Sequence, residues 1–169
     1  DNELNRDNFL KTHAIATEHL LPSQFRGVLR TGNMLIMEQQ TQRVQYEAAN
    51  ADIVKGEFGL FWSELDALMK LELNTEEIFY YASLLHLVFV KIHPFNDGNG
   101  RTGRLLEKWF IASKLGEKAW YIPSELYYYD NLKQYYDNLA NVGLFYEDLK
   151  YEKGMPFFLM LPQSLIFEK

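Results

Sequence analysis

Cysteine is absent from the 169 residues, which excludes a disulfide scaffold, a thiolate metal site and a cysteine nucleophile. Basic residues are scarce too: 17 Lys and Arg stand against 23 Asp and Glu, for a net charge of −6. No cluster of Lys and Arg offers a phosphate-backbone contact, and the apolar runs reach only about a dozen residues, too short for a membrane span. We therefore expect neither a nucleic-acid nor a membrane partner, and the lack of cysteine fits a reducing cytoplasmic location.

Hydrophobic residues (47%) and aromatic residues (15%) are abundant enough to build a sizeable core. Glycine and proline are scattered, and neither a repeat nor a linker-like segment interrupts the chain. A length of 169 residues is typical of one domain. We expect residues 1–169 to form a single domain, which can be the excised core of a longer protein because the sequence does not begin with Met.

Apolar residues recur at spacings of three and four along most of the chain, which predicts helices. Asn74 followed by Glu77 predicts the start of a central helix, and Pro94 predicts its end. The short apolar runs in residues 34–46 predict a β-hairpin instead. The expected fold class is therefore all-α with one small hairpin. The predicted helices cover residues 6–21, 58–73, 75–93, 99–116 and 124–141, and an apolar segment broken by prolines follows at 155–167.

The connection between the third and fourth predicted helices reads HPFNDGNGRTGR over residues 93–104. His93 ends a buried helix, so its imidazole would be held rigidly and could take a proton from an incoming hydroxyl. Asp97 offers the hard carboxylate oxygen that Mg²⁺ uses when it bridges to phosphates. The two residues predict a base and a metal ligand in one loop.

Gly98 and Gly100 flank Asn99 just before the next helix. They permit positive φ and leave backbone N–H groups free to bind an anion at the helix N-terminus. Arg101 and Arg104 lie one turn apart at the start of that helix, where the helix dipole disfavours cations. A bound oligophosphate would offset this cost, so the pattern predicts a phosphate site.

Each of these features has an ordinary explanation when taken alone, because histidines cap helices, Asp-Gly forms turns and surface arginines are usually solvated. Their conjunction within twelve residues favours a functional site. Gly98, Gly100 and Gly103 also satisfy G-x-G-x-x-G, but a dinucleotide-binding fold needs a strand before that motif, and a helix precedes it here. A Rossmann fold is therefore rejected.

The twelve residues resemble the signature of Fic-domain proteins, H-P-F-x-[DE]-G-N-G-R-x-x-R, at every defined position. The resemblance extends over most of the chain. LPSQFRG resembles the G-x-x-R segment upstream of the family's flap, residues 34–46 resemble the flap hairpin, and YYDNL and PFF resemble the closing helices. His86 precedes the signature at the usual place, where we interpret it as a core histidine. The resemblance implies a helical bundle whose flap lies over the active-site loop.

The activity implied by this resemblance is protein adenylylation, the transfer of AMP from ATP to a Ser, Thr or Tyr hydroxyl of a target protein. His93 would be the general base, and Asn99 would stabilise charge that develops on the α-phosphate. Asp97 would hold Mg²⁺ on the α- and β-phosphates. The implied ATP-binding residues of the loop are Gly98, Asn99, Gly100, Arg101 and Arg104.

The resemblance also implies residues outside the loop. Tyr136 and Asn141 are the candidates for contacting adenine, while Ile36 and Val44 belong to the flap that would dock a target segment. Many members of the family carry an inhibitory helix whose Glu pairs with the second Arg of the signature, and Glu168 is the tail candidate for it. A separate antitoxin chain is the alternative source of inhibition.

Other functions are compatible with the same loop. Doc-like toxins resemble this family but bind the nucleotide reversed and phosphorylate their targets, and removal of AMP from a modified protein is a further activity of the fold. Outside enzymes, the loop could serve a module that binds ATP without turnover. The intact base and metal carboxylate argue against that last alternative.

Overall fold

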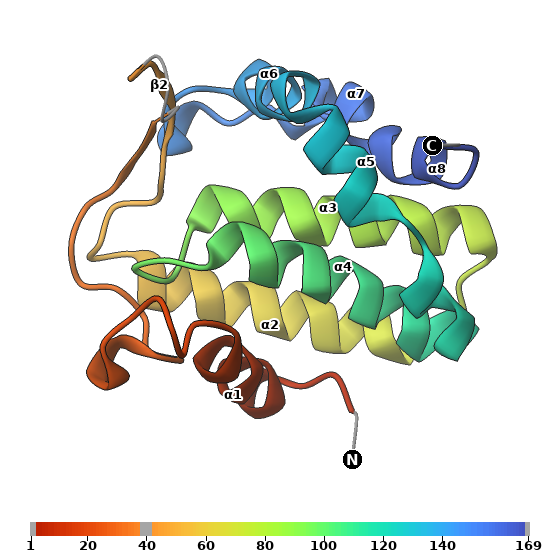
Figure 1. The fold of residues 1–169 in the computed structure, drawn as a ribbon, viewed down its shortest axis with the longest axis horizontal. Coiled ribbons are helices and arrows are strands. Elements are labelled where there is room, and N and C mark those ends of the chain that lie inside the picture. The colour runs from red at the N-terminus through yellow and green to blue at the C-terminus, as the bar shows by residue number, and fades with distance from the viewer. Residues whose placement is uncertain (1–2, 38–41, 168–169) are drawn as a thin grey trace.

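The computed structural model describes residues 3–37 and 42–167 and shows a helical bundle with a small β-hairpin (Figure 1). The axes of α2, α3 and α4 run side by side, with α1 on one side of them and α5 to α8 on the other. This confirms the expected fold class. The helices are α1 (Arg6–Ala16), α2 (Val54–Lys70), α3 (Thr75–Ile92), α4 (Asn99–Leu115), α5 (Ser124–Asp130), α6 (Leu132–Val142), α7 (Met155–Phe158) and α8 (Met160–Ser164), and the strands are β1 (Leu35–Met37) and β2 (Val44–Glu47).

The central helix α3 begins and ends where the sequence predicts. Asn74 Oδ1 accepts the Glu77 N–H at 2.9 Å and Glu77 Oε2 accepts the Asn74 N–H at 2.8 Å, which completes a capping box. At the other end, His93 adopts a left-handed conformation (φ 52°, ψ 59°) and Pro94 follows it. The helix therefore ends at Ile92, and the chain continues into residues 93–104, which we call the signature loop.

Helices α3 and α4 pack closely against each other at Gly103. A Cβ built on Gly103 would lie 3.0 Å from His86 Cδ2 and 3.1 Å from Val90 Cγ1, so the two backbones approach at this point more closely than a side chain allows. Since the loop joins these two helices, their close packing fixes the distance between its two ends.

Phe95, the aromatic residue of the signature, anchors the loop in the core. Its ring is 0% exposed and lies among Phe9, Phe58 and Phe89, with ring centroids 6.0 to 6.3 Å away. Removing a buried Phe ring of this kind typically costs about 3–5 kcal/mol of stability. The loop that carries the polar residues is therefore held from beneath by the hydrophobic core.

The predicted hairpin is confirmed, with shorter strands than its sequence pattern. β1 pairs antiparallel with β2, Ile36 opposite Tyr46 and Met37 opposite Val44, with a β-bulge between Ile36 and Met37. The connection between the strands lies outside the described residues. β2 is joined to the helical layer through the Glu47 N–H, which donates to Leu144 O at 2.6 Å.

Three predicted helices have different bounds. The first ends at Ala16, because the Thr17 hydroxyl and N–H both donate to His13 O and close the last turn. The second begins at Val54 and ends at Lys70, four and three residues before the predicted bounds. The tyrosine-rich helix is two helices, since Asn131 (φ −115°, ψ 36°) interrupts it between α5 and α6.

In the two stretches of chain that the structure describes, no helix combines the length and apolar character needed to cross a bilayer.

Candidate active site

A cavity of about 500 Å³ lies between the signature loop, the hairpin and the pair α5 and α6. We call it the loop cavity. Its polar end contains His93, Gly100 and Arg104, and the rest of its wall is aromatic and aliphatic. The remaining lining residues are Ile36, Tyr46, Val90, Glu125, Leu126, Tyr128, Tyr129, Leu132, Tyr135, Tyr136 and Leu139.

His93 lines this cavity, and its two ring nitrogens have different surroundings. Its Nδ1 lies 3.2 Å from Val90 O, and because a carbonyl only accepts, Nδ1 carries the proton. In the described parts of the chain Nε2 has no hydrogen-bond partner. Burial lowers the pKa of His93 to about 4, with a smaller contribution from the Arg30 charge, so the imidazole is neutral at pH 7. A neutral imidazole with an unprotonated Nε2 is the form that can accept a proton.

Tyr46 of β2 supports this histidine from the flap. Its hydroxyl donates to Val90 O at 3.0 Å and lies 3.2 Å from His93 Nδ1. Lys91 lies across the other side of Tyr46, its Nζ 4.2 Å from the ring centroid and donating to Gly143 O at 2.9 Å. Burial lowers the pKa of Lys91 to about 7. The hairpin and His93 are therefore joined through Val90 O, which both Tyr46 and His93 contact.

The turn at Asp97 and Gly98 is fixed by α1. His13 Nε2 lies 2.9 Å from Asp97 O, and the Gly27 N–H donates to His13 Nδ1 at 2.8 Å. A Cβ on Gly98 (φ 80°) would lie 2.5 Å from Thr17 Cγ2, so both the conformation and the space require glycine. No local signal in the sequence shows that His13 contacts a loop 84 residues away.

Asn99 is buried in the loop. It is 2% exposed, and its side chain binds both main-chain groups of Phe95: Oδ1 accepts the Phe95 N–H at 2.9 Å and Nδ2 donates to Phe95 O at 2.8 Å. The side chain therefore braces the loop, while the main chain of Asn99 lies at the start of α4; its part in stabilising charge on a phosphate stays a prediction.

The two arginines of the signature lie in different surroundings. Arg104 lines the loop cavity and lies near Gly100, where an added Cβ would be 3.3 Å from Arg104 Nη1. Arg101 is exposed and is not among the lining residues. The structure thus brings together His93, Gly100 and Arg104, with Gly98 and Asn99 as buried supports of the same turn.

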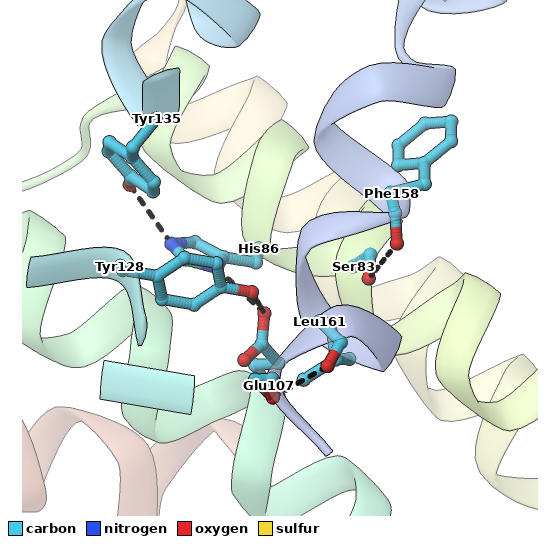
Figure 2. A network of polar contacts seen from close by, with 8 residues as sticks. Ser83, His86, Glu107, Tyr128, Tyr135, Phe158 and Leu161 are labelled. Atoms are coloured by element: carbon cyan, nitrogen blue, oxygen red, sulfur yellow. Dashed lines mark hydrogen bonds and ion pairs between the residues drawn. The ribbon is translucent and has the colours of Figure 1, made fainter. Parts of the chain in front are cut away.

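A buried polar network holds the tyrosine wall of the cavity (Figure 2). His86 lies between Glu107 Oε2, 2.8 Å from its Nδ1, and the Tyr135 hydroxyl, 3.1 Å from its Nε2. The Tyr128 hydroxyl donates to the same Glu107 oxygen at 2.8 Å. His86 and Glu107 are both 0% exposed. The expected core histidine is therefore confirmed, and it joins α3 and α4 to α5 and α6.

Some of the candidate site residues outside the loop line the cavity, and others do not. Tyr136 and Ile36 line the loop cavity. Asn141 is not among its lining residues: its Nδ2 donates to Lys153 O at 3.1 Å on the exposed surface, and its contact with adenine stays a prediction. Val44 is 50% exposed and lies opposite Met37, outside the cavity wall. Glu168 lies outside the described residues.

Asp97 is the candidate metal ligand. Its side chain is exposed at the loop surface, and Oδ1 accepts the Gly98 N–H at 2.6 Å. No group of three or more His, Cys, Asp or Glu in the described residues could enclose a metal ion. A single carboxylate suits Mg²⁺, which keeps several waters and shares its remaining positions with phosphates, so the donor set fits this ion as part of a nucleotide complex.

Comparison with known proteins agrees with this geometry. The family model described as Fic/DOC family matches residues 3–111. Two curated relatives named protein adenylyltransferase Fic, from Culex quinquefasciatus and Aedes aegypti, are 40% and 38% identical over 78 residues. That match covers 42% of this chain and only 14% of each relative. A crystal structure of a Fic family protein from Desulfovibrio desulfuricans G20 superposes with a TM-score of 0.75 at 24% identity, over 98% of this chain and 46% of that one.

Proposed function

The chain belongs to the Fic/DOC family, and on that premise we propose that it is a protein adenylyltransferase that uses ATP and Mg²⁺ to modify a hydroxyl of a target protein. The observation that carries the proposal is the state of His93: a neutral imidazole with Nδ1 bound to Val90 O and Nε2 left for a substrate, in the same cavity as Gly100 and Arg104. The curated relatives named adenylyltransferase support the same activity.

In this proposal the target hydroxyl attacks the α-phosphorus of ATP. Its proton passes to His93 Nε2, a bond forms between the hydroxyl oxygen and the α-phosphorus, and the bond to the bridging oxygen of the β-phosphate breaks, releasing pyrophosphate. General-base catalysis of this kind typically contributes about 10²–10⁴-fold. The rest of the acceleration comes from positioning and electrostatic stabilisation.

The start of α4 supplies that stabilisation. The main-chain N–H groups of Asn99, Gly100 and Arg101 precede the first helical hydrogen bond, which the Thr102 N–H makes to Gly98 O at 2.9 Å, so they and the helix dipole favour a phosphate there. Arg104 would bind an outer phosphate from the cavity wall, and Arg101 would act from the exposed side. Asp97 would hold Mg²⁺, which supplies positive charge to the phosphate oxygens.

The aromatic wall suits the nucleoside. Four tyrosines line the cavity together with Arg104, and two of them, Tyr128 and Tyr135, are fixed by the buried network; the other two are Tyr129 and Tyr136. Flat aromatic side chains offer an apolar surface on which a purine can stack. We place the adenine against this wall, with Tyr136 as its contact.

The flap would receive the target. Among the described residues the sheet has two strands, so the outer edge of β1 has main-chain groups available for a further strand. Ile36 on β1 lines the cavity, and Tyr46 opposite it contacts His93. An extended target segment added to β1 would therefore place a hydroxyl close to the base.

Labelled ATP tests the proposal. The protein is incubated with a cell lysate and with ATP that is labelled on either the α- or the γ-phosphate. We expect α-label in protein and release of pyrophosphate. Label from the γ-position alone would show a kinase, as in Doc-like relatives, and ATP binding without transfer of either label would show a binding module. The His93→Ala variant is the control, because label that persists in it does not come from this site.

A further inference from the structure

Arg30 is a buried arginine whose guanidinium, among the described residues, donates hydrogen bonds to main-chain oxygens alone. It is 2% exposed. Nε donates to His93 O at 2.6 Å, Nη1 to Gly32 O at 2.6 Å, and Nη2 to Ala49 O at 2.5 Å and Ile92 O at 3.1 Å. In the described residues it forms no ion pair with a carboxylate. LPSQFRG ends at Gly27, so the sequence analysis stopped three residues before the arginine that reaches the site.

The four oxygens belong to three different pieces of chain. Ile92 and His93 form the C-terminal end of α3, where the last carbonyls have no helical partner. Gly32 precedes β1 and Ala49 follows β2, so they are the two roots of the flap. The main chain of Arg30 adds a fifth hydrogen bond, because its N–H donates to Pro94 O at 2.9 Å. One side chain therefore joins the base to both ends of the flap.

This arrangement is costly for a purely structural contact. A buried charge without a counter-charge is stabilised only through its hydrogen bonds and through the negative end of the α3 dipole. The residue that it holds, His93, has φ 52°, a left-handed conformation that is unfavourable for a residue with a side chain. Strain of this kind persists where the surrounding contacts fix it, and the contacts here come from Arg30.

We propose that Arg30 is a positioning residue, whose guanidinium holds the left-handed His93 and the two roots of the flap in one fixed relation. The inference rests on the proposed function, in which the flap aligns a hydroxyl and His93 receives its proton. A planar fork of five N–H donors suits this role, since it reaches carbonyls in several directions at fixed angles. A lysine ammonium at the same place keeps the charge but not the fork.

The experiment compares Arg30→Met, which removes the charge and the fork, with Arg30→Lys, which removes only the fork. Folding is checked by circular dichroism and thermal denaturation. We expect kcat for adenylyl transfer to fall about 100-fold in Arg30→Met and about 10-fold or more in Arg30→Lys, because a misplaced base loses orientation. The Kd for ATP should stay within about threefold, since Arg30 is outside the nucleotide cavity.

A second measurement does not depend on turnover. The chain has four histidines, so ring nitrogen signals in NMR spectra can be assigned one by one. In the unchanged protein His93 should be the Nδ1–H tautomer with a pKa near 4. In both variants we expect mixed tautomers, because the ring is no longer held against Val90 O, and a pKa above 4, because a displaced ring is less buried. Arg30→Lys separates geometry from charge in this measurement.

Arg26→Met is the matched control. Arg26 also donates to a main-chain oxygen, from Nε to Leu21 O at 2.8 Å, but it contacts neither His93 nor the flap. It should leave kcat and the His93 signals unchanged. If the folded Arg30 variants behave like this control, the proposal is wrong; if Arg30→Met does not fold, Arg30→Lys decides. Failure of the proposed function is recognised separately, since unchanged protein without transfer activity still shows whether Arg30 holds the His93 ring.

Discussion

His13 and Asp97 are joined by a hydrogen bond of 2.9 Å between the Nε2 of one and the main-chain oxygen of the other. Because the Gly27 N–H donates to His13 Nδ1, the proton of His13 lies on Nε2, which donates to Asp97. The ring also stacks on Phe95, with centroids 3.7 Å apart. His13 and His93 are thus neutral histidines with opposite tautomers, one fixing the turn of the loop and the other leaving Nε2 open to a substrate.

This pair predicts how stability depends on pH. Burial is the largest cause of the lowered pKa in both histidines, and for His93 it brings the value to about 4. A lowered pKa in the folded protein means that the unfolded chain binds the proton more readily, so stability is complete above pH 6.5 and is lost as the pH falls toward 4. We expect the unfolding free energy of the unchanged protein to fall by about 2–3 kcal/mol more than that of His93→Gln between pH 7 and 4.5. Urea denaturation at a series of pH values measures it, and identical pH profiles would contradict the assignment.

The catalytic prediction concerns His93 itself. His93→Ala should lower kcat by at least about 100-fold while the Kd for ATP changes only a few-fold, because a base acts mainly in the transition state. In the unchanged protein, the rate should not follow a titration near pH 6.5, since the imidazole is already neutral there. Single-turnover kinetics with α-labelled ATP and calorimetric ATP binding give the two quantities. Near-normal turnover in His93→Ala would show that another group is the base.

Gly100 decides which phosphate meets the acceptor. A Cβ there would already lie 3.3 Å from Arg104 Nη1, so a lysine chain must displace the guanidinium and fill the space for outer phosphates. We expect Gly100→Lys to lose adenylylation by about 100-fold or more, which α- and γ-labelled ATP would measure separately.

Gly56→Lys is the control for this change. Gly56 lies on α2, and a Cβ there meets nothing within 4 Å, so activity should be retained. Adenylylation that survives in Gly100→Lys would contradict the assigned orientation of the nucleotide.

The flap makes a prediction about the target rather than the nucleotide. Ile36→Pro and Val44→Pro each remove a main-chain N–H and break the strand conformation of the hairpin. Transfer to protein should fall about 10-fold or more in both, while ATP binding stays unchanged. Ile36→Thr keeps the N–H and the β-branched shape, so it should retain transfer. Equal loss of ATP binding in the proline variants would mean that the hairpin supports the fold instead.

The sequence by itself determined those parts of the protein that depend on neighbouring residues. Asn74 and Glu77 define the start of α3, and Pro94 defines the end, because capping and proline geometry act within a turn of helix. The signature in residues 93–104 placed His93, Gly100 and Arg104 close together for the same reason. The periodicity of apolar residues predicted the helical class, though not the break at Asn131.

Only the tertiary structure decided what surrounds these residues. Arg30 lies 63 residues before His93 and His13 lies 84 residues before Asp97, and no spacing rule connects positions so far apart. The same holds for Asn141, which the family resemblance marked as a candidate adenine contact and whose side chain donates to Lys153 O at the surface. The candidate reactive residues lie close together in the sequence of the loop. The conformation that makes them usable depends on long-range contacts with buried polar groups, whose hydrogen bonds must be satisfied by whichever main chain the fold brings near.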